Sequence, residues 1–194
     1  MLYFKKLIVL LGLFFLVGSQ AVQANTDFEK AIQGRWLSEI TEEIPSDADT
    51  TNGVMKMIGV DEYLGNGALN MQGQLLMTFN YKNGTQIIAS WLINAAGEWQ
   101  IKNDLIYEKI VDIRAIPDFV KLNGSLLSAD DQKNFFQQSG FKIEDLIPKG
   151  QTSEDQIISI NDKSFGYKTK NDQGNYDVRN KTKTNAGFST YQIK

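Results

Sequence analysis

The sequence predicts a mainly β fold: an antiparallel meander of about eight to ten strands that forms a barrel, with one or two short helices. The first observation is a period-two alternation of apolar and other residues, clearest at 75–81. The second is a turn signal between successive runs, strongest at Asn83-Gly84, because Asn-Gly favours the tight turn of a hairpin. Short strands separated by turns in this way are typical of a barrel or sandwich.

The predicted elements follow one another along the chain. A short helix is expected at 26–33, where Phe28, Ala31 and Ile32 share a face, and a polar loop at 41–53. Strands before residue 117 are expected at 35–40, 54–64, 68–81, 85–93, 98–102 and 105–115, with a turn at 94–97. Later strands are expected at 156–161, 164–170, 175–182 and 188–193.

The stretch 117–149 differs from the strands around it. Pro117 is expected to end the preceding strand, because proline cannot donate a ladder hydrogen bond. Ser128, followed by Asp130 and Asp131, has the pattern of a helix start, and Gly140 that of a helix end. We therefore predict a helix at 128–139, a second helical turn at 143–146, and a helical insertion over 117–149.

Residues 1–24 have the three parts of a secretory signal. Lys5 and Lys6 precede an apolar run at 7–17, and Val22-Gln23-Ala24 places small or modest side chains at the exit. The alternative, an uncleaved anchor, is less favoured because the run is shorter than the ~20 residues that span a bilayer. We expect cleavage to leave 25–194 as one domain without a transmembrane segment, in a bacterial periplasm or secreted.

Composition excludes several classes of function. The chain has no cysteine and no histidine, which excludes disulfides, thiolate chemistry, histidine-ligated zinc and Ser-His-Asp catalysis. We expect no enzyme activity, no metal and no cofactor. Without Lys5 and Lys6, 18 basic residues face 23 acidic ones, and no basic cluster stands out. A nucleic-acid partner, whose phosphates require a positive face, is therefore not expected.

Two Gly-x-Trp motifs carry a family resemblance. Gly34-Arg35-Trp36 opens the first strand after a helical turn, and Gly97-Glu98-Trp99 follows the Asn83-Gly84 hairpin. This arrangement resembles the lipocalins and the wider calycin group, and 79–105 resembles bacterial lipocalin-like domains. The likeness covers 27–115, lacks the Thr-Asp-x-x-x-Tyr motif, and implies a ligand-binding barrel. It also implies that Arg179 is the late-strand arginine that packs across Trp36.

An eight-stranded barrel is just wide enough to hold one small ligand. The candidate lining residues share one predicted strand face or are aromatic: Leu75, Met77, Phe79, Tyr81, Trp91 and Tyr107. The alternative is that they fill the core. Trp36 and Trp99, with the motif glycines Gly34 and Gly97, either close the base of a pocket or plug the barrel end, and the plug is the favoured interpretation.

The leading functional hypothesis is an exported, lipocalin-like protein that binds a small apolar or amphipathic molecule, such as a lipid, inside the barrel. Tyrosine or asparagine groups at the mouth would fix its orientation. The alternative is a protein–protein interaction module of the envelope or the medium, with an accessory, adhesion or inhibitor role. It would use an outer face or 117–149, because insertions on a rigid scaffold often carry function.

Overall fold

The computed structural model describes residues 22–140, 142, 147–171 and 174–192. The helices are α1 (Val22–Ile32), α2 (Ala129–Gln138) and the 3₁₀ helix η1 (Phe188–Thr190). The strands are β1 (Gly34–Ile44), β2 (Thr50–Tyr63), β3 (Ala68–Tyr81), β4 (Gln86–Lys102), β5 (Leu105–Leu122), β6 (Ser125–Leu126), β7 (Thr152–Ile160), β8 (Ser164–Lys170) and β9 (Tyr176–Thr184). Among the described residues, no helix is long and apolar enough to cross a membrane.

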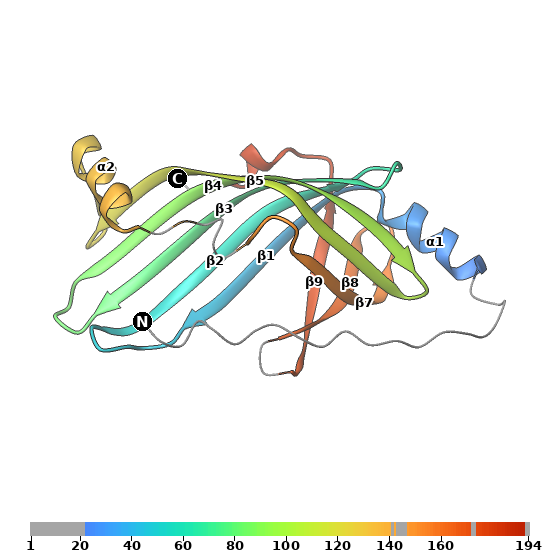
Figure 1. The fold of residues 1–194 in the computed structure, drawn as a ribbon, viewed down its shortest axis with the longest axis horizontal. Helices are drawn as coiled ribbons and strands as arrows, with labels where there is room; N and C mark the ends of the chain where they lie inside the picture. The colour runs from blue at the N-terminus through green and yellow to red at the C-terminus, as the bar shows by residue number, and fades with distance from the viewer. Residues whose placement is uncertain (1–21, 141, 143–146, 172–173, 193–194) are drawn as a thin grey trace.

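All nine strands belong to one antiparallel sheet (Figure 1). The order is β4-β3-β2-β1-β9-β8-β7-β5-β6, and a further pairing of β4 with β5 closes eight of the strands into a ring. β6 lies outside the ring and pairs only with the end of β5. The predicted fold class is confirmed, and the meander is compatible with a calycin-like fold.

The ring is closed more completely at one end than at the other. β1 pairs with β2 over its whole length, but with β9 only at 35–38 against 181–184. β5 likewise pairs with β4 from 105 to 122, but with β7 only at 105–109. We call the end that holds both short pairings the closed end. The opposite end, where β1–β5 extend beyond their partners towards α2, is the open end (Figure 1).

The closed end is filled by an aromatic and aliphatic cluster. Trp36 is fully buried, its ring meets Phe165 edge to face at 5.9 Å, and its Nε1 donates to the carbonyl oxygen of Ile32 at the end of α1. Tyr63 meets Trp99 in the same way at 5.8 Å. The buried members of this closed-end cluster are Ile32, Trp36, Tyr63, Leu69, Trp99, Ile101, Ile106, Ile157, Phe165 and Tyr167.

The open end holds a second cluster, partly covered by α2. Ser128 caps this helix by accepting a hydrogen bond from the Asp131 amide at 3.2 Å, so the predicted helix at 128–139 is confirmed. No residue of α2 is fully buried, but Phe136 meets Trp91 edge to face at 5.4 Å. The buried members of this open-end cluster are Leu75, Met77, Ala89, Trp91, Ile93, Ile110, Ile113 and Val120.

The predicted turn at 94–97 is wrong, because β4 continues through it. Asn94, Ala95 and Ala96 pair with β3 on one side and β5 on the other. Gly97 lies at a register shift against β5, where a Cβ atom would be 2.5 Å from the carbonyl oxygen of Lys109. The glycine therefore permits a close approach of two strands and does not mark a turn.

The predicted strand end at Pro117 is also wrong. β5 runs through Pro117 to Leu122, and Pro117 lies beside the register shift at Ser90 and Trp91, where its lack of an amide is tolerated. The stretch 117–149 is thus not a helical insertion throughout: it contains the end of β5, then β6, then α2. The predicted helical turn at 143–146 lies outside the described residues.

The remaining differences concern element ends. The predicted loop at 41–53 is shorter, because β1 continues to Ile44 and β2 begins at Thr50. The predicted last strand at 188–193 is wrong: Phe188 begins η1 and packs on Ile58 and Val60 of β2. The first helix is confirmed, although it starts at Val22. Most of the predicted signal, 1–24, lies outside the described residues.

Candidate ligand-binding cavity

A cavity of about 290 Å³ lies inside the ring, between the two clusters. Its apolar wall comes from the open-end side and is formed by Ile40, Met57, Met71, Ile93, Ile110, Ile113 and Ile147. Its polar wall adjoins the closed end and the gap beyond it between β1 and β9, and is formed mainly by Ser38, Asp61, Glu108, Asp155, Tyr167, Thr169, Arg179 and Lys181. Two larger depressions, of about 740 and 730 Å³, lie beside the short pairings, are lined mainly by exposed polar residues, and each share two lining residues with the cavity.

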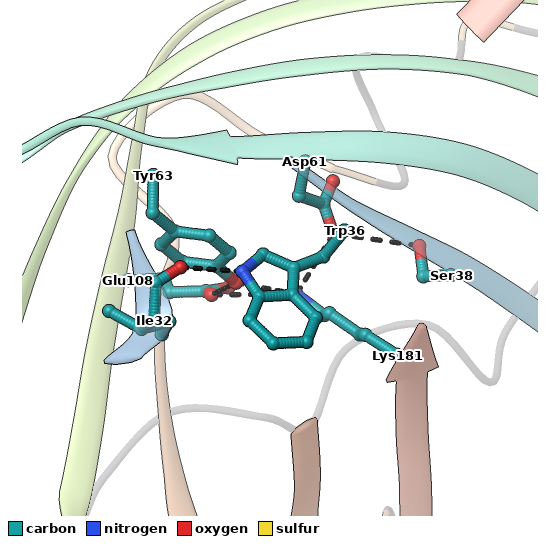
Figure 2. A network of polar contacts seen from close by, with 7 residues as sticks. All are labelled: Ile32, Trp36, Ser38, Asp61, Tyr63, Glu108 and Lys181. Atoms are coloured by element: carbon teal, nitrogen blue, oxygen red, sulfur yellow. Dashed lines mark hydrogen bonds and ion pairs between the residues drawn. The ribbon is translucent and has the colours of Figure 1, made fainter. Parts of the chain in front are cut away.

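The polar wall is organised around Lys181 of β9 (Figure 2). Its Nζ lies 2.9 Å from Oδ2 of Asp61 on β2 and 3.7 Å from Oε1 of Glu108 on β5. It also donates to the hydroxyl of Tyr63 at 2.6 Å, and this hydroxyl donates to Glu108. Three strands that are distant in sequence are thereby joined inside the ring.

Both members of the closer ion pair are buried, since the Lys181 and Asp61 side chains are each 7% exposed. Burial alone would lower the pKa of Lys181, but Asp61 and Glu108 together outweigh it and raise the pKa well above its usual value. The ammonium also lies 5.1 Å from the ring centroid of Tyr63 and 5.5 Å from that of Tyr167. Lys181 is therefore held in its charged form.

Asp155 of β7 is a further carboxyl group on the polar wall. The residue is 8% exposed and makes no ion pair among the described residues. Burial raises the pKa of Asp155, and the nearby Glu108 raises it further. A hydrogen bond from the Thr169 side chain and the charges of Lys181 and Arg179 act in the opposite direction without cancelling the rise. The polar wall thus carries three carboxyl groups, of which two, those of Asp61 and Glu108, share the single positive charge of Lys181.

The expectation for Arg179 is wrong. Its guanidinium pairs with Glu42 of β1 at 2.8 Å, across the gap where β1 and β9 separate. Lys183, which lies nearer the closed end of β9, has its Nζ 4.2 Å from the ring centroid of Trp36 instead. The reason is register: 183 pairs opposite Trp36, whereas 179 lies beyond the last β1–β9 pair.

The residues proposed from sequence as ligand-lining lie elsewhere. Leu75, Met77 and Trp91 belong to the open-end cluster, and Phe79 packs against it. Tyr81 lies at the end of β3, and Tyr107 lines one of the larger depressions. None of them lines the cavity. Trp36 and Trp99, with Gly34 and Gly97 beside them, lie at the closed end, where both rings are in the cluster.

The sequence reasoning missed Asp61, Glu108, Asp155 and Lys181. A signal was available, because Glu108 alternates with Ile106 and Ile110, and both of these isoleucines are buried inside the ring. A charged residue at an inward position of an apolar strand face is costly unless it is paired, so it indicates a buried polar site. No local pattern, however, indicates which residues on other strands complete that site.

No protein-family model matches the chain, and the search of curated proteins returned no match. In the described part of the chain, no group of three or more acidic side chains is arranged to hold a metal ion.

Proposed function

We propose that the protein is an exported, lipocalin-like binding protein that holds one small amphipathic molecule inside its barrel. The observation that carries this proposal is the cavity itself, which has an apolar wall facing a buried, charged wall. Its volume of about 290 Å³ is close to the lower end of ligand pockets, at roughly 300 Å³. Such a volume suits a single short chain and not a lipid with several chains.

Binding would follow from burial of the ligand's apolar part. Each methylene removed from water contributes about 0.8 kcal/mol, so a chain of six to eight carbons supplies roughly 5–6 kcal/mol before the costs of association. The polar wall, fixed by the Lys181 network, would hold the other end of the ligand. Because this network joins β2, β5 and β9, its geometry is set before the ligand arrives.

The test is native mass spectrometry on the protein purified gently from a bacterial envelope. Ile113, which is buried and lines the cavity, is replaced by tryptophan to fill it. Val111, on the same strand but half exposed, receives the same replacement as the matched control. We expect a bound mass of the order of one to two hundred daltons, from about ten heavy atoms.

The bound mass should persist in Val111→Trp and disappear in Ile113→Trp. A melting curve for each variant checks that both are folded. A ligand-free mass for the unmodified protein, with no uptake of added octyl compounds, would contradict the proposal. Export is tested by the same spectra, because cleavage after Ala24 leaves Asn25 as the first residue.

The second candidate is a protein–protein interaction module. It is supported by α2, in which every residue is at least partly exposed at the open end. It draws less support than the cavity, because Phe136 is directed at Trp91 and connects the helix to the open-end cluster. Replacement of α2 by a flexible linker should abolish a partner interaction, while binding of a ligand in the cavity, which no residue of α2 lines, should survive it.

A further inference from the structure

We propose that the polar end of the ligand is a protonated amine and not a carboxylate or phosphate. This inference rests on the proposed function, because it concerns the chemistry of the same cavity. The polar wall presents the carboxyl groups of Asp61, Glu108 and Asp155, and the cations Lys181 and Arg179. The question is which of these groups remains available to an incoming molecule.

Both cations are already engaged. Lys181 directs its ammonium to Asp61, to Glu108 and to the Tyr63 hydroxyl. Arg179 is bound to Glu42, which does not line the cavity. An anionic ligand that took Arg179 would break a pair whose side chains are 27% and 47% exposed, and it would still face the three carboxyl groups of the polar wall. One that took Lys181 would leave Asp61 and Glu108 without their cation inside the ring. Removing one partner of a buried pair is strongly unfavourable.

The carboxyl groups, in contrast, offer more acceptor positions than the surrounding donors occupy. Each ionised carboxylate has about four lone-pair sites. The donors found are the Lys181 ammonium and the Tyr63 hydroxyl, with a weak contact from Ser38 to Asp61 at 3.5 Å. Asp155 accepts a hydrogen bond from Thr169 and is attracted to Lys181 and Arg179, but it forms no ion pair among the described residues. A ligand that brings donors and positive charge would satisfy these acceptors.

The cavity volume sets the size of the probes. At about 30 Å³ for each heavy atom, the space that a water occupies in the liquid, the cavity takes about ten heavy atoms. Octylamine, 1-octanol and octanoate are of this size and share one chain. They differ only in the charge of the polar end, so differences in affinity report on the polar wall.

The experiment is isothermal titration calorimetry of the mature protein with these three compounds at neutral pH. We expect octylamine to bind best and octanoate worst, with a difference of at least about tenfold between them. In Asp155→Asn, octylamine should lose about tenfold in affinity while 1-octanol is unchanged. The matched control is Glu154→Gln, the exposed neighbour on the same strand, which should leave all three affinities unchanged.

The outcomes separate this inference from the proposed function. If octanoate binds as well as octylamine, or Asp155→Asn keeps the preference for the amine, the inference is wrong and the cavity remains a binding site. If none of the three compounds binds, both proposals fail. Loss of all binding in Ile113→Trp establishes that the heat comes from the cavity.

Discussion

Strands β1–β5 run through both ends of the barrel, yet the interiors of the two ends differ. At the closed end, where β1 meets β9 and β5 meets β7, aromatic rings such as those of Trp36 and Tyr63 are buried in one packed cluster. At the open end, β1 and β9 have separated, and α2 covers the strands without a single buried residue. The cavity lies between these two arrangements.

This difference suggests a division of roles. Closing a ring of strands on both sides brings inward side chains close enough to pack, which stabilises the fold. Separating the same strands leaves space that side chains do not fill. The buried Lys181 network lies at the boundary, so it both joins the closed end and forms one wall of the cavity.

The largest predicted effect is at the closed end. Trp36→Ala should lower the free energy of unfolding by about 3–5 kcal/mol, because it removes a fully buried ring. Phe136→Ala at the open end should cost about 1 kcal/mol, the value of one aromatic contact. Urea denaturation of both variants measures the difference. Equal losses of unfolding free energy in the two variants would contradict the proposed difference in packing between the two ends.

The second prediction concerns the boundary network. Lys181→Met should lower the free energy of unfolding by about 3–5 kcal/mol, because it leaves the buried Asp61 and the partly buried Glu108 without their cation. The control is Lys56→Met, which removes a solvent-exposed ion pair with Glu39 and should cost less than about 1 kcal/mol. A loss of the same size in both variants would mean that the network contributes little.

A smaller effect is expected where β4 and β5 approach each other. Gly97→Ala should destabilise by about 1–3 kcal/mol, because the new methyl group meets the Lys109 carbonyl oxygen and the strands must move apart. Gly187→Ala is the control, since nothing lies within 4 Å of a Cβ atom there. Thermal unfolding compares the two, and an unchanged melting temperature for Gly97→Ala would refute the close approach.

The smallest effect is a dependence on alkaline pH. The pKa of Tyr63 is raised by burial and by Glu108, and that of Lys181 by Asp61 and Glu108 against the effect of burial. Above about pH 10 the unfolded chain loses these protons while the folded chain keeps them, so stability falls as pH rises. Tyr63→Phe should make this fall less steep in urea titrations at pH 9–11. Tyr176→Phe, an exposed position, should leave it unchanged.

Much of the fold was predictable because its signals are local. β3 and β8 begin and end at the predicted residues, since period-two alternation and flanking turns define them. The prediction of a turn at 94–97 was wrong because Asn94 and Ala95 are paired with strands on both sides, and this pairing outweighs the local preference for a turn. The prediction that the strand ends at Pro117 was wrong for a related reason: the register shift between β4 and β5 accommodates a residue without an amide hydrogen.

The site was less predictable than the fold. Asp61, Glu108 and Lys181 come from three strands spread over 120 residues, and only the register of the closed ring brings them together. Local patterns indicate which face of a strand is buried, but not which residues meet across it. The aromatic residues chosen from the sequence stood out for their size. Trp91 and Phe79 pack in or against the open-end cluster, and Tyr107 lines one of the larger depressions.

Hydrogen–deuterium exchange with and without octylamine tests the division between the ends most directly. Amides at 35–38 and 60–63 should exchange only through global unfolding, whereas those at 110–120 and in α2 should exchange through local opening. Because octylamine binds only the folded chain, it should slow exchange at 35–38 by the factor by which binding stabilises the whole fold, and it should also slow exchange at 110–120 by stabilising the cavity wall. Uniform protection along β1–β5, or slowing confined to the closed end, would contradict the account.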